Sequence, residues 1–446
     1  MEVREENLIL AATRVVKRLR EAGHEAYFAG GAVRDQLLGI TPHDVDIATS
    51  AHPDEVQLLF PRVSDLQGKA FGVVRVMEED QVFEIATFRN DGDYSDGRRP
   101  ETVAFATARE DAQRRDFTVN GLFWDPLEQR VIDWVNGVDD LQARRLRAIG
   151  KAGDRFKEDH LRLFRAVRFA TQLGFEVEAE TWEEVCAHAQ LASRLAPERV
   201  RDELVKCFCG PDPGRALDLL DQAGLLRHWI PEVEEMKGVD QPPEYHPEGD
   251  VYTHVRLMMG MLKNADPVLA FSVLLHDIAK PDTRTVDDSG RIRFNGHESV
   301  GARKAEEIMR RLRFSNQMIE AVSECVAGHM KFKDSLSMKL STLKRFLARP
   351  YFEQEMELHR IDCLGCHQDL SIYEFLRTKQ EEFSKQPLLP EPLVNGEDLK
   401  AVGMKPGPEM GKLLRQLQDE QLEGLIQDRD TALARAREWW HALSGE

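Results

Sequence analysis

The sequence predicts an α+β protein: a small mixed sheet near the N-terminus carries the active site, and all-helical domains follow. Strand patterns come early in the chain, as an apolar run at 25–29, an alternating run at 44–47, and a hairpin formed by 70–76 and 81–87. Helical patterns dominate residues 176–236, where Pro197 suits the first turn of a helix.

Composition and charge narrow the class of protein. The chain has 446 residues, of which 42% are hydrophobic and 31% charged, as in a soluble globular protein of several domains. Its apolar runs fall short of a membrane span of roughly 20 residues, and its N-terminus does not resemble a signal peptide. The six cysteines fit a reducing compartment, so we expect a cytoplasmic protein. The net charge of −18 argues against nonspecific coating of nucleic acid, although residues 144–168 form a basic segment.

The segment 25–49 organises the N-terminal part of the chain. After an amphipathic helix at 5–22, we expect a strand at 25–29, a turn at Gly30 and Gly31, and a short helix whose start suits a phosphate. Asp44 and Asp46 then alternate with apolar residues, so both carboxylates project from one strand face. Two such carboxylates can hold a pair of Mg²⁺ ions.

Two later segments bear on the same site. Glu84 is either a third metal carboxylate or an outward-facing strand residue. Residues 89–100 are too rich in Gly and Asp for a helix or strand and indicate a loop over the site. Between 114 and 120, Arg-Arg-Asp-Phe-Thr-Val-Asn is either a surface ion pair or a triphosphate and ribose site, because guanidinium groups suit phosphate oxygens.

Taken together, these motifs resemble those of the polymerase-β-like nucleotidyltransferases. Gly-Gly-x-Val-Arg-Asp-x-Leu-Leu-Gly and Arg-Arg-Asp-Phe-Thr-x-Asn narrow the resemblance to the bacterial tRNA CCA-adding enzyme and poly(A) polymerase family, called class II. Gly121 stands where that family usually has Ala. The resemblance implies catalytic, Mg²⁺-binding Asp44 and Asp46, and nucleotide contacts from Gly31, Arg34, Arg115, Asp116 and Asn120. It also implies that the loop 89–100 helps change nucleotide preference.

A helix predicted over 158–169 adds a base-reading element. On one helix, Asp159, Arg162 and Arg165 step by three and are neighbours. Alone they would be an ion-paired face, but the resemblance implies that Asp159 and Arg162 select the incoming base. A carboxylate can accept from the exocyclic amine of C or A, while a guanidinium donates to ring acceptors. Arg165 and Arg168 complete the predicted nucleotide site.

Histidines and aspartates form a second set after Tyr245. His254, His276, Asp277 and Asp362 resemble the first-metal ligands of the HD phosphohydrolase superfamily, and His297 and His329 match positions of further ligands. The predicted ion is Mn²⁺, Ni²⁺, Co²⁺ or Mg²⁺. An inert HD fold is the alternative. Cys363 and Cys366, with His359 and His367 nearby, invite a zinc interpretation, but helical spacing around Asp362 explains this segment more simply.

The predicted product is a tRNA with CCA added at its 3′ end, made from CTP and ATP with Mg²⁺. We expect a nucleotidyltransferase head at 1–150, a helical neck at 151–236, an HD domain at 237–384 and a helical tail that contacts tRNA at 385–446. A poly(A) polymerase or an enzyme that adds only A or only CC shares these motifs. From another class, the chain could be an HD phosphohydrolase with an RNA-binding head. Neither a membrane nor a protein partner is indicated.

Overall fold

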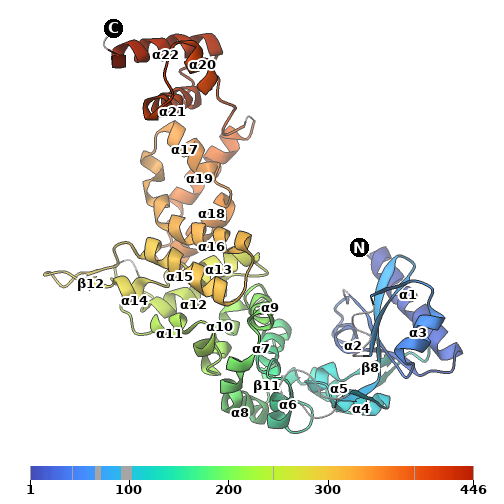
Figure 1. The fold of residues 1–446 in the computed structure, drawn as a ribbon. Helices are drawn as coiled ribbons and strands as arrows, with labels where there is room; N and C mark the ends of the chain where they lie inside the picture. The colour runs from blue at the N-terminus through green and yellow to red at the C-terminus, as the bar shows by residue number, and fades with distance from the viewer. Residues whose placement is uncertain are drawn as a thin grey trace. The chain divides into compact units, whose positions relative to one another are not determined.

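The computed structural model describes residues 2–42, 44–65, 72–91, 103–244, 246–385 and 387–444. The chain divides into two compact units (Figure 1). Unit 1 comprises Met1–Glu234, Leu262–Ala265 and Arg311–Phe314, and unit 2 comprises Glu235–Met261, Asp266–Arg310 and Ser315–Glu446. The predicted boundaries at 150, 236 and 384 stay predictions.

Unit 1 contains a seven-stranded sheet in the order β3-β4-β5-β2-β1-β8-β9. Its strands are β1 Ala26–Ala29, β2 Asp46–Thr49, β3 Val63–Asp65, β4 Val73–Glu78, β5 Gln81–Thr87, β8 Phe123–Asp125 and β9 Arg130–Ile132. Strands β2 and β5 run parallel and the other pairs run antiparallel, so the predicted mixed sheet is confirmed. The small pairs β6 Arg89–Asp91 with β7 Val103–Phe105, and β10 Arg145–Leu146 with β11 Glu176–Val177, lie outside it.

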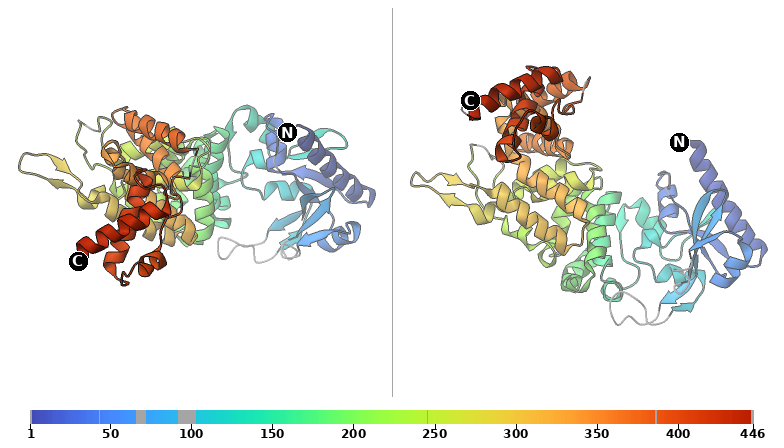
Figure 2. Two further views of the ribbon diagram at one scale, coloured as in Figure 1. Left: turned by 90° about the horizontal axis from the view of Figure 1, so that it is seen from above. Right: turned by 45° about the horizontal axis from the view of Figure 1, so that its top comes forward.

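Local sequence explains the early elements. The predicted hairpin is confirmed as β4 and β5, joined by Glu79 and Asp80 with φ of 47° and 62°. Positive φ at both turn positions matches the twist of the flanking strands. The first helix, α1, buries Ala11, Val15 and Leu19 and lies against the sheet (Figure 2). This amphipathic helix was also predicted.

Helices make up the rest of unit 1. They are α1 Glu2–Glu21, α2 Gly31–Leu37, α3 Pro53–Leu59, α4 Ala108–Gln113, α5 Gly137–Gln142, α6 Ala152–Glu158, α7 Arg162–Leu173, α8 Ala179–His188, α9 Pro197–Phe208, α10 Pro213–Gln222, α11 Pro231–Glu235, and the 3₁₀ segments η2 Thr118–Asn120, η3 Ala189–Arg194 and η4 Leu226–His228. The helix predicted at Pro197 is confirmed.

Two predictions about unit 1 need correction. The continuous helix over 158–169 is wrong, because α6 ends at Glu158 and Asp159 has extended backbone angles, φ −131° and ψ 106°. The loop predicted over 89–100 is wrong at its start, because Arg89–Asp91 pairs as β6 with β7. The remainder of that loop, 92–100, lies outside the described residues.

Unit 2 is built of helices. They are α12 Val251–Met261, α13 Pro267–Leu275, α14 Lys280–Thr283, α15 His297–Arg311, α16 Asn316–Gly328, η5 His329–Ser337, α17 Leu340–Leu347, α18 Phe352–Gly365, α19 Ser371–Phe383, α20 Gly396–Ala401, α21 Pro408–Leu422 and α22 Arg429–Ser444. A short hairpin, β12 Thr285–Val286 with β13 Ile292–Arg293, projects from them in Figure 1.

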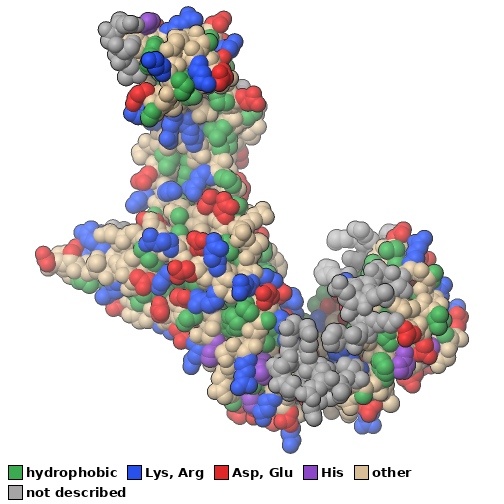
Figure 3. All heavy atoms as spheres, in the orientation of Figure 1, with side chains coloured by type: hydrophobic (Ala, Val, Ile, Leu, Met, Phe, Trp, Pro, Cys, Tyr) green, Lys and Arg blue, Asp and Glu red, His purple; other side chains and the backbone are tan. Residues whose placement is uncertain are grey.

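The apolar helix α13 forms the centre of unit 2. Residues 269–275 are all buried, and α13 contacts α12, α16 and α18. On the face shown in Figure 3, basic and acidic side chains of unit 2 are intermixed, as expected for surface pairs such as Arg310 with Glu306. Across the part of the chain that the structure describes, no helix is both long and apolar enough to cross a membrane.

Candidate functional site

A polar cleft of about 630 Å³ opens in unit 1. All eleven residues predicted for the nucleotidyltransferase site line it, although they come from separate segments of the chain. They are Gly31, Arg34, Asp44, Asp46, Arg115, Asp116, Asn120, Asp159, Arg162, Arg165 and Arg168. Gly30, Arg89, Arg114, Phe169 and Lys206 line it as well.

Gly30 shapes the turn between β1 and α2. Its φ is 70°, a conformation that favours glycine, and a Cβ there would lie 2.9 Å from Nη1 of Arg115. Its N–H donates to the carbonyl of Leu122 at 3.1 Å. Glycine therefore lets the backbone approach the arginine that lines the cleft.

The two predicted metal carboxylates share one face. Asp44 and Asp46 are exposed while Val45 and Ile47 are buried, although β2 itself begins only at Asp46. Loss of water around Asp46 and the charges of Asp44 and Glu84 raise the pKa of Asp46 to about 6. Carboxylates that repel one another in this way suit a divalent cation, which offsets the repulsion.

Glu84 faces outward on β5. Its carboxylate accepts from Arg75 Nε at 2.8 Å, across the β4–β5 pair. The structure therefore gives this residue a cross-strand partner. Its contribution to the site is the negative charge that it adds near Asp46.

Asp116 is the hub of a buried hydrogen-bond network. Its Oδ1 accepts from the N–H of Phe117 and from Asn120, at 2.8 and 3.1 Å, and its Oδ2 accepts from Arg165 Nε at 2.7 Å. Burial alone would raise the pKa of Asp116, but Arg165 and Arg162 lower it to about 2. The side chain of Asn120 in turn accepts from Arg34 at 2.6 Å. This network orients Arg165 and Arg34, which both line the cleft.

Arg114 and Arg115 directly follow the end of α4. Both pair with the buried carboxylate of Asp111, at 2.7 and 3.1 Å. Burial would raise the pKa of Asp111, but the two guanidinium groups lower it. The ion-pair interpretation thus holds with Asp111 as the partner, and Arg115 still reaches the cleft.

The break before α7 changes how the base-reading pair is held. Asp159 accepts from both terminal nitrogens of Arg199, at 3.1 and 3.0 Å. Arg162 donates to Glu158 at 2.7 Å and to two backbone carbonyls. A guanidinium has five N–H donors, so these three contacts leave some for a ligand. Arg199 escaped the sequence analysis because it lies 40 residues from Asp159.

Three contacts within the protein hold the guanidinium group of Arg168. Its Nε donates to Glu203 at 2.6 Å, its Nη1 donates to Gln172, and the guanidinium lies over the ring of Phe169. Burial lowers its pKa despite the charge of Glu203. Lys206, three residues after Glu203 on α9, also lines the cleft. No motif in the sequence marked this residue.

A second cluster lies in unit 2. We call it the His–Asp cluster, and its members come from α12, α18, the ends of α13 and α16, and the start of α15. They are the six predicted residues His254, His276, Asp277, His297, His329 and Asp362. Asp277 is central, with its oxygens 3.1 Å from His276 Nε2, 3.4 Å from His297 Nε2 and 3.8 Å from His254 Nε2.

Backbone carbonyls fix three of these histidine rings. Nδ1 of His276, His297 and His329 lies 2.9, 2.8 and 2.6 Å from the carbonyl oxygen three residues earlier. A nitrogen that faces a carbonyl oxygen carries a proton, so each of these rings, when neutral, has its lone pair on Nε2, toward the cluster. Burial lowers the pKa of His329 to about 3, which keeps that ring neutral.

Two of these nitrogens face one another. Nε2 of His297 and Nε2 of His329 are 3.1 Å apart, so when both rings are neutral their lone pairs point together. Nε2 of His254 lies 3.2 Å from Asp362 and has no hydrogen bond there. Burial would raise the pKa of Asp277, but His276 and Lys280 hold it well below its usual range. A divalent cation fits this buried set of imidazoles and carboxylates.

A cleft of about 540 Å³ opens onto the His–Asp cluster. Asp277, His297, His329 and Asp362 line it, together with the basic residues Lys280, Arg291, Arg293 and Lys333. Basic residues around a metal-type cluster suit an anionic ligand such as a phosphate ester. Lys280, which also donates to Gln241, lacked a recognisable motif.

The two cysteines near Asp362 do not converge. Cys363 Sγ lies 3.6 Å from His359, while Cys366 Sγ lies 3.3 Å from His246 Nδ1. The set of Cys363, Cys366, His359 and His367 is not among the groups of donors that lie close enough to share an ion in the described residues.

Models of known families match three parts of the chain. Residues 26–147 match the poly A polymerase head domain, 174–237 match "Probable RNA and SrmB-binding site of polymerase A", and 298–436 match domain 2 of tRNA nucleotidyltransferase. The chain is 32% identical over 420 residues to the CCA-adding enzyme of Streptococcus uberis, covering 92% of each protein. The chain belongs to the CCA-adding enzyme family.

Other members of the CCA-adding enzyme family extend the comparison. The match to Geobacillus thermodenitrificans is 46% identical but spans about half of that relative, 52% of its length. The Bacillus stearothermophilus CCA-adding enzyme in complex with CTP has a TM-score of 0.75 and 25% identity, over 98% of both chains. The Thermotoga maritima CCA-adding enzyme complexed with tRNA, 19% identical with a TM-score of 0.59, shows the shared fold.

Proposed function

We propose that this chain adds CCA to the 3′ end of tRNA, using CTP and ATP. The supporting observation is the convergence of the eleven predicted residues on one cleft, where the carboxylates of Asp44 and Asp46 and several arginines line the same space. Membership of the CCA-adding enzyme family supports the same reaction. The alternatives are a poly(A) polymerase and an enzyme that adds only A or only CC.

The cleft residues have separate roles in this proposal. Asp44 and Asp46 would hold Mg²⁺, whose charge would favour loss of the ribose hydroxyl proton and stabilise the departing pyrophosphate. Arg34, Arg115 and Arg165 orient the triphosphate, since their guanidinium groups are held by Asn120, Asp111 and Asp116. The protein mainly positions its substrates.

Base selection belongs to Asp159 and Arg162. Asp159 accepts from the amine of C or A, and Arg162 donates to the ring acceptors with the N–H groups left by its three protein contacts. Uracil and guanine present the opposite pattern at these positions. Arg199 is a positioning residue that holds the Asp159 carboxylate.

Sequencing the products tests the reaction. Purified protein is incubated with tRNA lacking CCA, CA or A, together with CTP and ATP, and each 3′ end is read. Completion of CCA on all three substrates is expected. Extension by A alone, arrest after CC, or a long A tail would each identify the corresponding alternative. Asp44→Ala is the control and should lower incorporation of C and A alike by several orders of magnitude.

We propose a second activity for the His–Asp cluster, hydrolysis of a phosphate ester with a bound divalent metal. The Nε2 atoms of His297 and His329, 3.1 Å apart, support metal binding, and the basic residues that line the cleft support an anionic substrate. The ligands would be the six cluster residues, and Mn²⁺, Ni²⁺, Co²⁺ or Mg²⁺ would supply an activated water.

Metal analysis and phosphodiesterase assays on 2′,3′-cyclic nucleotides test the second activity. Wild type should bind metal and hydrolyse the ester, and Asp44→Ala should do so equally. The double variant His276→Ala with Asp277→Ala should lose hydrolysis and keep CCA addition. If wild type neither binds nor hydrolyses with any of the four ions, the cluster is architectural.

A further inference from the structure

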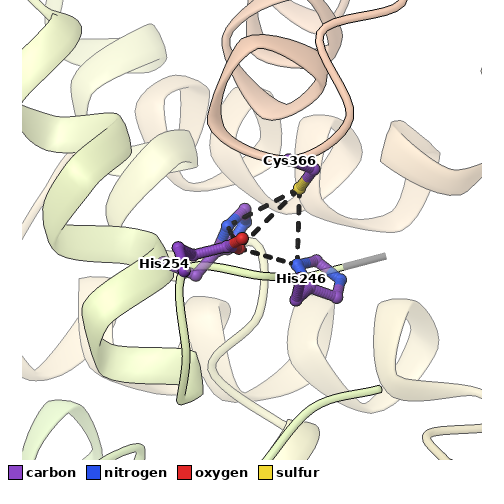
Figure 4. Close-up of side chains that lie close together, drawn as sticks. His246, His254 and Cys366 are labelled. Atoms are coloured by element: carbon purple, nitrogen blue, oxygen red, sulfur yellow. Dashed lines mark hydrogen bonds and ion pairs between the residues drawn. The ribbon is translucent and has the colours of Figure 1, made fainter. Parts of the chain in front are cut away.

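A second group of metal-type donors lies on the far side of the His254 ring from the His–Asp cluster. Nε2 of His254 faces Asp362, while its Nδ1 lies 2.7 Å from Glu248 and 3.7 Å from Cys366. The ring of His246 lies beside His254 and Cys366 (Figure 4). His246 and Glu248 lie on the segment before α12, and Cys366 caps the end of α18. We call these three residues with His254 the HECH set.

The donor atoms of the HECH set converge on one point. Glu248 Oε1 lies 2.7 Å from His254 Nδ1 and 2.9 Å from His246 Nδ1. Cys366 Sγ lies 3.3 Å from His246 Nδ1, 3.7 Å from His254 Nδ1 and 3.9 Å from Glu248 Oε1. Ligand bonds of about 2.0–2.3 Å in a tetrahedron place donors roughly 3.3–3.6 Å apart. The measured separations between the donor atoms, from 2.7 to 3.9 Å, lie on both sides of that spacing.

The HECH set is largely buried, and hydrogen bonds within it do not satisfy all of its polar atoms. The side chains of His254 and Glu248 are 0% and 6% exposed, and that of His246 is 17% exposed. Glu248 Oε1 can accept from both rings, but Glu248 Oε2 is buried and has no hydrogen-bond partner among the described residues. A buried oxygen without a partner destabilises the folded chain. A cation would engage this carboxylate and the sulfur together.

We propose that the HECH set binds a tetrahedral divalent ion of the zinc class. Imidazole, carboxylate and thiolate donors favour Zn²⁺, and Co²⁺ can take its place. The thiol proton of Cys366 is released as the ion binds. If the His–Asp cluster also held a metal, His254 would offer Nδ1 to one ion and Nε2 to the other, and its ring proton would be released to solvent as the second ion binds.

Four protein ligands close this site, so its role is structural. The ion would tie the segment before α12 to the end of α18 and would hold His254 for the neighbouring cluster. The proposal does not depend on phosphohydrolase activity, because it concerns binding alone. Only Cys366 brings sulfur to the metal, which provides a distinctive readout.

The test is Co²⁺ titration of the metal-free full chain, followed by absorption spectroscopy. A thiolate ligand produces a near-ultraviolet sulfur-to-cobalt charge-transfer band. Wild type should show this band at saturation with one thiolate-bound Co²⁺ per chain, and Cys366→Ser should lose it. Cys363→Ser is the matched control, because Cys363 faces His359, and should keep it. His329→Ala alters only the His–Asp cluster and should also keep it.

Two results would overturn the proposal. One is a wild-type protein that binds Co²⁺ without the charge-transfer band, since all ions would then have nitrogen and oxygen ligands. The other is a band that persists in Cys366→Ser. Glu248→Gln gives a second variant that keeps the side-chain volume, and it should weaken Zn²⁺ retention during dialysis at least tenfold. Circular dichroism of each metal-free variant checks that the chain is folded.

Discussion

Replacing Asp46 with Asn should stabilise unit 1 while abolishing nucleotide addition. The pKa of Asp46 rises from 3.8 to about 6 in the folded protein because of lost hydration, Asp44 and Glu84. Ionising this carboxyl therefore costs at most about 3 kcal/mol at 1.36 kcal/mol per pKa unit. Asp46 is exposed, so solvent screening reduces the gain expected from Asp46→Asn to ~1 kcal/mol, or about 2–4 °C in Tm.

The pH dependence gives this prediction its sign. Because the folded pKa is raised, the neutral carboxyl favours folding below pH 3.8, and that advantage is lost as pH rises through about 6. The gain of Asp46→Asn should thus be full at pH 7.5 and roughly half as large at pH 5. Melting in EDTA by scanning fluorimetry measures it. Mg²⁺ should then stabilise wild type and leave the variant unchanged.

Two outcomes would refute this reasoning. If Asp46→Asn melts at or below wild type at pH 7.5 in EDTA, the carboxylates do not repel one another in the folded protein. If its gain is the same at pH 5 and pH 7.5, the stabilisation has a cause other than the charge of Asp46. A normal rate of C and A addition would remove Asp46 from the catalytic residues.

Two further predictions concern the cleft. Gly30→Ala should destabilise the protein by about 1–2 kcal/mol through backbone strain, and it should also lower nucleotide addition because the new Cβ displaces Arg115. Gly39→Ala is the matched control, since Gly39 has the same φ of 70° but open space around its Cβ, and it should lower stability alone. Melting and incorporation assays separate the two effects. Arg199→Ala should raise misincorporation of UTP and GTP about 5–30-fold and lower the rate of CTP incorporation by a smaller factor, and Asp159→Ala should do the same. Nucleotide competition assays measure this. An equal loss of incorporation rate for all four nucleotides would make Arg199 structural.

Patterns with a short period predicted the first part of the fold well. The alternation around Asp44 and Asp46 and the hairpin ending at Glu79 and Asp80 are local features, and the sheet preserves them. The break at Asp159 was hidden because Phe156, Leu163 and Phe164 continue the apolar helical pattern across it, with neither glycine nor proline at the junction. Helical periodicity therefore could not locate the end of α6.

Partners far apart in the chain were beyond sequence reasoning. The predicted residues of the cleft belong to recognisable motifs, whereas Arg199 and Glu203 look like any polar residues of an amphipathic helix. Their roles are visible only in the folded chain, where α9 packs against α7. Cys366 meets Glu248 across 118 residues of sequence, and only the packed helices of unit 2 show that they are neighbours. Such pairs depend on tertiary packing rather than on spacing.

The carbonyl contacts of the histidines affect how the His–Asp cluster tolerates mutation. His276, His297 and His329 take their ring orientation from main-chain oxygens, which a point substitution cannot delete. His254 instead depends on the side chain of Glu248. Substitutions of neighbouring side chains therefore leave the ring orientation of three of the four histidines unchanged. His254 is the ring that one neighbouring substitution can reorient.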